Sequence, residues 1–247
     1  MKLKDIFNYL TEGELSQLSI GGGDLGQIRA EDYRKVMRAI NLGLTSLFTR
    51  FALKEGSFEL VLDPDITRYV LKVEHAVSNP TVGVPKYIND LALPFDNDLL
   101  KIQNIKTEAG FELPFNVLDN KFSCTASSHD VLEVPSSLAL QSGDLPEQYR
   151  TPFLLVSYRA SHPLLDTSDG TTIDPDAVEV DLPFAYLEPL LYYVAARIHR
   201  PANSRNDLDP VSSYSAKYEQ ACQRLESTNL DLDREEGSTK FYDRGWT

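Results

Sequence analysis

The spacing of apolar residues along the first part of the chain predicts two helices. Between residues 33 and 51, apolar side chains recur every three or four positions, which is the period of a helix with one buried face. These positions are Tyr33, Val36, Met37, Ile40, Leu44, Leu47, Phe48 and Phe51. A shorter stripe with the same period comes first, at Leu3, Ile6, Phe7 and Leu10. Both stripes need apolar partners elsewhere in the chain.

The same period returns in the last third and predicts two further helices. Asp181 and Pro183 are typical of a helix start. The stripe that follows consists of Leu187, Leu190, Leu191, Val194 and Ile198. Pro189 would kink a helix that began at Pro183, because a proline beyond the first turn removes a backbone hydrogen bond. The last helix starts at Asp209 and Pro210, and its apolar face carries Val211, Tyr214, Tyr218, Ala221, Cys222 and Leu225.

The middle of the chain has the alternating pattern of β-strands. Residues 58–62 and 69–73 alternate apolar and polar side chains, and residues 131–135 and 153–160 are two further strand candidates. Residues 98–116 are typical of a hairpin with the turn sequence TEAG. Proline and glycine separate these segments.

These patterns together predict an α+β fold. We expect a bundle of about four helices from both ends of the chain, with a β-rich central insertion and an extended C-terminal tail. The expected domains are a helical bundle formed by residues 1–56 and 182–225, a β-rich insertion of residues 57–181, and a tail of residues 226–247.

Charge and composition narrow the class of protein. The net charge of the 247 residues is −13, which argues against a general nucleic-acid binder because phosphate binding needs clustered lysine and arginine.

No apolar run is typical of a membrane span, and Asp5 and Glu14 interrupt any secretory signal, so we expect the protein to stay in the cytoplasm where it is made. Cys124 and Cys222 lie far apart in the sequence, and we expect both to be reduced thiols.

We expect neither a cofactor nor a metal ion. GGGDLG at residues 21–26 fits the pattern GxGxxG, but the segment before it has a helical pattern, whereas a dinucleotide site needs a strand there. The four histidines and the two cysteines lack the spacing of metal ligands, and the acidic clusters lack the pattern of a calcium loop. We therefore expect that the protein is not an enzyme. The alternative is an enzyme, namely a hydrolase built in the β-rich insertion around Asp166, Ser168 and Asp174.

The tail carries an unusual share of the aromatic residues for a chain end. Phe241, Tyr242 and Trp246, the single tryptophan of the protein, lie within the last seven residues beside Lys240 and Arg244. Aromatic residues of this kind are typical anchors of protein interfaces. The tail is therefore the first candidate for a partner contact.

The order of these segments resembles the head-to-tail adaptor proteins, or portal connectors, of short-tailed bacteriophages. The resemblance rests on YRKVMRAINLGLTSLFTRFALKEGSFEL, the β-rich insertion, LEPLLYYVAARIHR, the amphipathic helix YSAKYEQACQRLES and the aromatic tail. It implies a structural protein of the virion neck or tail, assembled in the host cytoplasm. Such proteins form a homo-oligomeric ring, usually of twelve copies, that joins the portal to the distal tail or nozzle protein.

The resemblance also implies roles for particular residues. The C-terminal segment would clasp the portal protein through Lys240, Phe241, Tyr242, Arg244 and Trp246. The hairpin residues Glu108, Phe111 and Phe115 are the weaker candidates for the distal tail contact. DNA would pass through the ring during ejection without sequence-specific binding, and an acidic channel wall would repel its phosphates. The alternative is another phage tail-completion or assembly protein.

Overall fold

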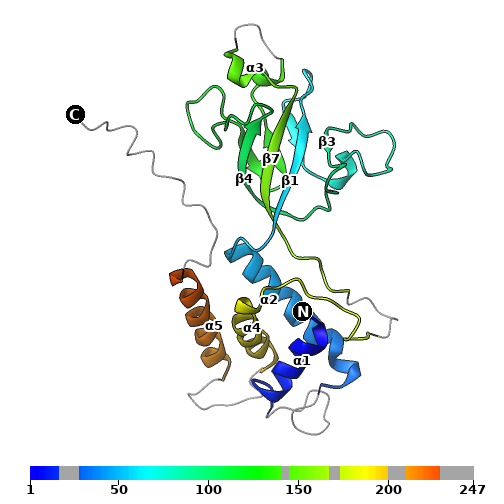
Figure 1. The fold of residues 1–247 in the computed structure, drawn as a ribbon, viewed down its shortest axis with the longest axis vertical. Coiled ribbons are helices and arrows are strands. Elements are labelled where there is room, and N and C mark those ends of the chain that lie inside the picture. Colours follow the sequence, from blue (N-terminus) through cyan, green and yellow to red (C-terminus); the bar gives the residue numbers. More distant parts are fainter. Residues whose placement is uncertain (17–27, 141–144, 167–172, 200–209, 229–247) are drawn as a thin grey trace, which may run out of the picture. The chain divides into compact units, whose positions relative to one another are not determined.

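A computed structural model of the chain describes residues 1–16, 28–140, 145–166, 173–199 and 210–228 (Figure 1). Its internal contacts divide it into two compact units. We call Met1–Ala52 with His162–Thr247 the terminal unit, and Leu53–Ser161 the central unit. The sequence pattern predicts an insertion with the bounds 57 and 181, so the central unit begins and ends earlier than predicted.

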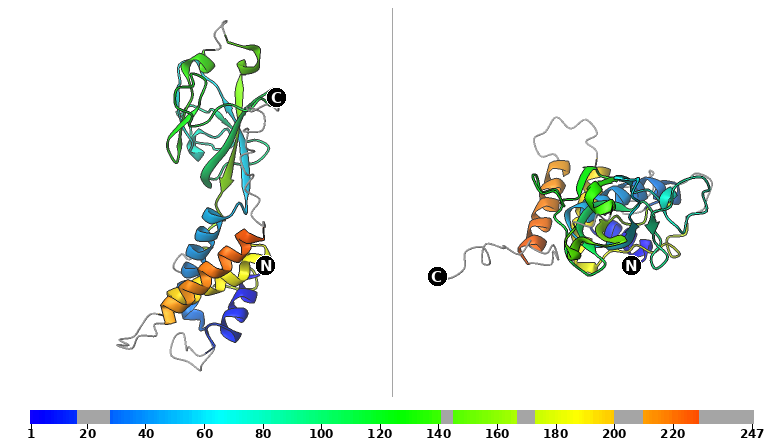
Figure 2. Two further views of the ribbon diagram at one scale, coloured as in Figure 1. Left: turned by 90° about the vertical axis from the view of Figure 1, so that its left-hand side faces the viewer. Right: turned by 90° about the horizontal axis from the view of Figure 1, so that it is seen from above.

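The terminal unit contains helices from both ends of the chain. They are α1 (Leu3–Glu12), α2 (Tyr33–Arg50), α4 (Leu187–Ile198) and α5 (Pro210–Ser227), with 3-10 turns at Ala30–Asp32 and Phe184–Tyr186. α1 buries its predicted stripe, Leu3, Ile6, Phe7 and Leu10. α2 buries the predicted stripe from Val36 to Phe48, whereas Tyr33 is half-buried and Phe51 follows the end of the helix. α4 packs against α2 and α5, and it lies beside α5 in Figure 1 and in the left-hand view of Figure 2.

The packing of α2 on α4 depends on a residue without a side chain. A Cβ atom added to Gly43 would lie 2.6 Å from Cδ1 of Leu190 and 3.1 Å from Cδ1 of Tyr193. Leu190 is fully buried, so it has little room to move. Gly43 therefore permits the close approach of the two helices.

Hydrogen bonds and ion pairs join the C-terminal end of α2 to α5. The guanidinium of Arg50 donates to Glu219 over 2.7 Å and to Glu226 over 2.7 Å. One turn earlier, the hydroxyls of Ser46 and Tyr218 are 2.8 Å apart. The hydrogen bond from Arg50 lowers the pKa of Glu226, while desolvation acts in the opposite direction.

The start of the chain is held by a later segment of the same unit. Leu3 N donates to Val178 O over 2.9 Å, and Val180 N donates to Met1 O over 2.7 Å. An antiparallel bridge between Lys2 and Glu179 lies between these two bonds. The residues around 175–180, which the sequence pattern places in the β-rich insertion, thus pair with the N-terminus.

The central unit contains two antiparallel sheets. The larger has the strand order β3-β1-β7-β4 and consists of β1 (Glu55–Val61), β3 (Ile88–Asn89), β4 (Leu99–Thr107) and β7 (Phe153–Ala160). The smaller has the order β2-β6-β5 and consists of β2 (Arg68–Val70), β5 (Thr125–Ser128) and β6 (Val131–Glu133). A short helix, α3 (Ser136–Ala139), and 3-10 turns at Val73–His75 and Glu147–Tyr149 complete the unit.

The first and last strands of the central unit pair with each other. β1 and β7 are antiparallel, in a register that runs from Glu55 opposite Arg159 to Val61 opposite Phe153. A further backbone bond joins Ala160 N to Lys54 O over 2.9 Å. The two sheets share a continuous apolar core that includes Leu60, Tyr69 and Val156.

The predicted fold class is wrong. The described residues form five α-helices and two antiparallel sheets of four and three strands, so the fold is mixed and is not a helical bundle. The periodicity of the sequence found most elements, but it does not tell which elements pack together. The sheets of the central unit bury their own core and are as much a part of the architecture as the helices.

Candidate interaction surfaces

An aromatic pair forms a ridge on the surface of the terminal unit. The rings of Tyr9 in α1 and Phe184 in the 3-10 turn before α4 meet edge to face, with centroids 6.3 Å apart. Phe184 is 70% exposed and Tyr9 is 45% exposed. Large apolar side chains that remain this exposed are typical of contact surfaces.

The ridge separates two hollows in the surface. The first, with a volume of about 360 Å³, is lined by Tyr9, Glu14, Phe184, Ala185, Leu187, Glu188, Leu191 and Tyr192. The second, of about 340 Å³, is lined by Met1, Asp5, Asn8, Tyr9, Glu12 and Phe184. We call the ridge and its two hollows the ridge groove. Its floor is mainly apolar on one side, and carboxylates border it on both sides.

Helix α5 borders the ridge groove. Arg224 lies 3.4 Å from Glu188, and the ammonium of Lys217 lies 5.5 Å from the ring centroid of Tyr192. The hydroxyl of Tyr192 donates to Glu188 over 3.0 Å. Burial, followed by this hydrogen bond, raises the pKa of Tyr192. The contact at Arg224 places the last turn of α5 next to the groove.

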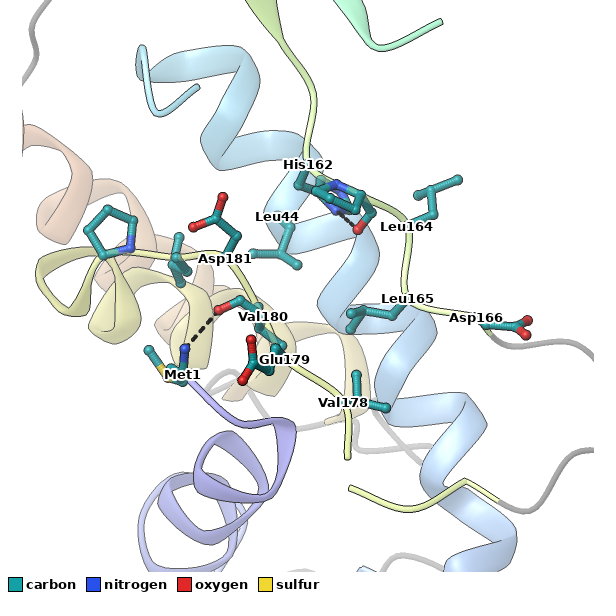
Figure 3. Close-up of a pocket in the computed structure, with 13 residues that line it drawn as sticks. Met1, Leu44, His162, Leu164, Leu165, Asp166, Val178, Glu179, Val180 and Asp181 are labelled. Atoms are coloured by element: carbon teal, nitrogen blue, oxygen red, sulfur yellow. Dashed lines mark hydrogen bonds between the residues drawn. The ribbon is translucent and has the colours of Figure 1, made fainter. Parts of the chain in front are cut away.

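A separate cavity of about 530 Å³ lies beside α2 (Figure 3). Its lining consists of Met1, Leu44, His162 to Asp166, and Val178 to Pro183. His162 is buried, with Nε2 3.1 Å from the hydroxyl of Thr45 and Nδ1 2.9 Å from its neighbour's carbonyl oxygen. The exposed carboxylates of Asp166, Glu179 and Asp181 give this cavity an acidic rim.

The residues of the alternative hydrolase site are only partly described. Asp166 lies at the cavity, whereas Asp174 is exposed and accepts a hydrogen bond from Asp176 N over 3.0 Å. Ser168 lies outside the described residues. In the described ranges, no group of three His, Cys, Asp or Glu side chains is placed to hold a metal ion.

The candidates for the distal tail contact lie just after β4. Thr107 N donates to Phe111 O over 2.9 Å, and the turn passes through Gly110, whose φ of 80° favours glycine. Glu108 is exposed and Phe111 is 38% exposed. Phe115 is half-buried against the core of the central unit. Of the three, Glu108 and Phe111 are thus the more accessible.

Phe111 belongs to an aromatic cluster that the sequence did not indicate. Its ring centroid lies 5.2 Å from that of Tyr149, which stacks on Phe122 at 4.3 Å. The ammonium of Lys121 lies 4.8 Å from the centroid of Phe122. We call Phe111, Phe122 and Tyr149 the aromatic cluster of the central unit. These residues are distant in the sequence, so no local pattern joins them.

The central unit also exposes apolar side chains on its loops. Val82 is 94% exposed, Leu91 is 73% exposed and Leu118 is 88% exposed. Each lies between strands, where a periodic pattern gives no information about exposure.

The residues assigned to the portal contact, Lys240, Phe241, Tyr242, Arg244 and Trp246, lie outside the described residues. The described part of α5 ends next to the ridge groove, and the tail sequence follows it.

Comparison with known proteins adds no family. No protein-family model matches the sequence, and no curated protein matches it. Within the described residues, no helix combines the length and the apolar character needed to span a membrane.

Proposed function

We propose that this protein is a structural head-to-tail adaptor, which joins the portal to the tail components of a short-tailed phage as a homo-oligomeric ring. The observation that carries the proposal is that each unit exposes large apolar side chains of its own. The terminal unit has the Tyr9–Phe184 ridge. The central unit exposes Phe111 after the edge strand β4, and it exposes Val82 and Leu91 on the loops that flank the opposite edge strand, β3.

Two separate surfaces suit a protein that must contact several neighbours. In a ring, each subunit uses two different faces toward its neighbours, and a connector also needs contacts above and below the ring. Exposed apolar side chains gain stability when such contacts bury them. The segment order that resembles the adaptor family supports the same proposal.

The tail would supply the portal contact. Phe241, Tyr242 and Trp246 can fill pockets on a partner, while Lys240 and Arg244 lie at the polar rim of such an interface. The aromatic cluster of the central unit is the corresponding candidate for the distal tail protein. DNA would pass the acidic subunits without sequence-specific contacts.

The proposal is tested by co-sedimentation of the purified chain with the portal ring of the same virus. A chain truncated after Thr228 keeps the whole of α5, including Glu226, and removes the tail. We expect the full chain to sediment with the portal and the truncated chain to remain in the supernatant. Circular dichroism of both chains shows whether the truncation leaves the fold intact.

A point substitution tests the anchor itself. We expect Trp246→Ala to weaken the portal contact by about 2 kcal/mol or more, since buried tryptophans are typical hot spots. Thr247→Ala is the matched control and should bind as the parent does. If the full chain does not sediment with the portal at all, the adaptor proposal is wrong and another phage assembly role takes its place.

A further inference from the structure

The ridge groove lacks a cover among the described residues, although its centre is aromatic. Phe184 remains 70% exposed, and the hollow beside it is lined by the apolar side chains of Leu187 and Leu191. Exposed aromatic rings that border a hollow are favourable places for another aromatic group. The groove therefore fits a segment that combines aromatic and cationic side chains.

The chain itself contains such a segment. Residues 240–246 place Phe241, Tyr242 and Trp246 beside Lys240 and Arg244, and with the single carboxylate of Asp243 the segment keeps a net charge of +1. The groove offers the rings of Tyr9 and Phe184 to the aromatic side chains of this segment. To its lysine and arginine, the groove offers the carboxylates of Asp5, Glu12, Glu14 and Glu188. Glu188 already lies 3.4 Å from Arg224, so an arginine beside this groove has a precedent in the structure.

The end of α5 places this segment within reach. The contact between Arg224 and Glu188 positions the last turn of the helix at the groove. The twelve peptide steps from Thr228 to Lys240 span at most about 43 Å when fully extended. A short linker of this kind gives a tethered segment an effective concentration of about a millimolar, so weak contacts are sufficient.

We infer that the ridge groove binds residues 240–246 of the same chain before the subunit meets a partner. The aromatic rings of the tail would pack on Tyr9 and Phe184, and Lys240 and Arg244 would lie among the carboxylates. If the tail also binds the portal, the portal must displace it from its own subunit. That consequence rests on the proposed function, whereas the docking itself does not.

The single tryptophan makes this docking measurable in the intact protein. Because Trp246 is the only tryptophan, all tryptophan fluorescence of the full chain reports on the tail. If the tail is docked, the emission lies at a shorter wavelength than that of a free peptide of residues 238–247, and acrylamide quenches it less. Emission and quenching equal to those of the free peptide would overturn the inference.

A substitution in the groove and a control outside it sharpen the test. Phe184→Ala should shift the emission to longer wavelength and increase its quenching. The matched control is Leu164→Ala, because Leu164 is 76% exposed and lines the separate cavity of Figure 3. Both positions are mostly exposed, so we expect both variants to fold, which circular dichroism checks. Equal effects of the two substitutions would contradict docking in the groove.

A second measurement uses separate molecules. The chain truncated after Thr228 has no tryptophan, so the peptide of residues 238–247 gives all the tryptophan fluorescence when it is titrated with this chain and tryptophan is excited selectively. We expect saturable binding that Phe184→Ala weakens at least about tenfold. Absence of binding up to a chain concentration of about a millimolar, which is the effective concentration of the tethered segment, would contradict the inference.

The dependence of the tryptophan emission on protein concentration shows whether the docked segment comes from the same chain or from a second copy. Docking within one chain predicts the same emission of the full chain over the whole concentration range, whereas docking onto a second copy predicts a shift that disappears on dilution. The latter result would overturn docking within the same chain. None of these measurements uses the portal, so their failure and the failure of the adaptor proposal are distinguishable.

Discussion

At the residue scale, the contact between Gly43 and Leu190 makes a clear prediction. Gly43→Ala raises helix propensity by about 1 kcal/mol, but its Cβ would lie 2.6 Å from a fully buried leucine side chain. Overpacking of a buried contact costs about 1–3 kcal/mol. We therefore expect the substitution to lower the free energy of unfolding in urea.

Measuring Gly43→Ala in the Leu190→Ala variant shows whether the clash with Leu190 is the cause of the destabilisation. In Leu190→Ala the nearest obstacle is gone, and Gly43→Ala should be more favourable there than in the parent by at least about 1 kcal/mol. The same effect in both backgrounds would show that packing against Leu190 is not the reason. Leu42→Ala, at a half-exposed position of the same helix, is expected to change stability by less than about 1 kcal/mol.

Single residues also show how much of the candidate sites the sequence could reveal. Phe111 is a candidate contact residue through the resemblance to the adaptor family, whereas its ring partners Phe122 and Tyr149 come from other loops and no sequence pattern pointed to them. Phe184 was overlooked because Asp181 and Pro183 favoured a helix start that would include it. The helix begins at Leu187 instead, and Phe184 lies in the exposed turn before it.

At the scale of elements, Arg50 makes the attachment of α5 to α2 dependent on pH. The pKa of Glu226 is lowered in the folded chain from its ordinary value of 4.5, chiefly by the hydrogen bond from Arg50. The stabilisation by this carboxylate is thus fully present above pH 4.5 and is lost as the pH falls through the lower folded value. We expect Glu226→Gln to be less stable than the parent at pH 7, and the difference to shrink in acid.

Urea unfolding at a series of pH values measures this difference. Glu133→Gln removes an exposed carboxylate in β6 of the central unit, and it serves as the control for the loss of one negative charge. A stability difference for Glu226→Gln that stays constant down to pH 3 would exclude the ion pair as its source. High salt should reduce the difference at pH 7, because the carboxylate is 42% exposed.

The helices and strands differ in how clearly their sequence patterns predict them. The strand at 153–160 was predicted with the bounds that β7 has, because its apolar residues cluster strongly. β5 was missed because its sequence, TASS, has no apolar alternation, and pairing with β6 holds it. Pro189 is compatible with α4 because the helix starts at Leu187, which places the proline in the first turn.

At the scale of the whole molecule, the central unit should fold without the rest of the chain. It has its own core, and its first and last strands pair, so both cut ends lie next to each other. We expect a fragment of residues 53–161 to unfold in urea in a single cooperative transition. Leu60→Ala, at a fully buried position, should lower its stability by about 2–5 kcal/mol.

The outcome for this fragment has a direct alternative. A fragment without a cooperative transition, or one whose transition does not respond to Leu60→Ala, would show that the central core needs the terminal unit.

The pairing of β1 with β7 also explains why the fold class was not predictable from the sequence. The two strands are about a hundred residues apart, and the period of a strand says nothing about which distant strand completes its sheet.

The adjacency of the ends of β1 and β7 also has a mechanical consequence. A pulling force that enters at Ala52 and leaves at His162 acts on neighbouring ends of two antiparallel strands, near the bond between Ala160 and Lys54. The hydrogen bonds of this pair would then carry the load one after another, as in a zipper, and not all at once. Tension along the polypeptide would therefore open the central unit from this end, at a lower force than sliding the two strands past each other would need.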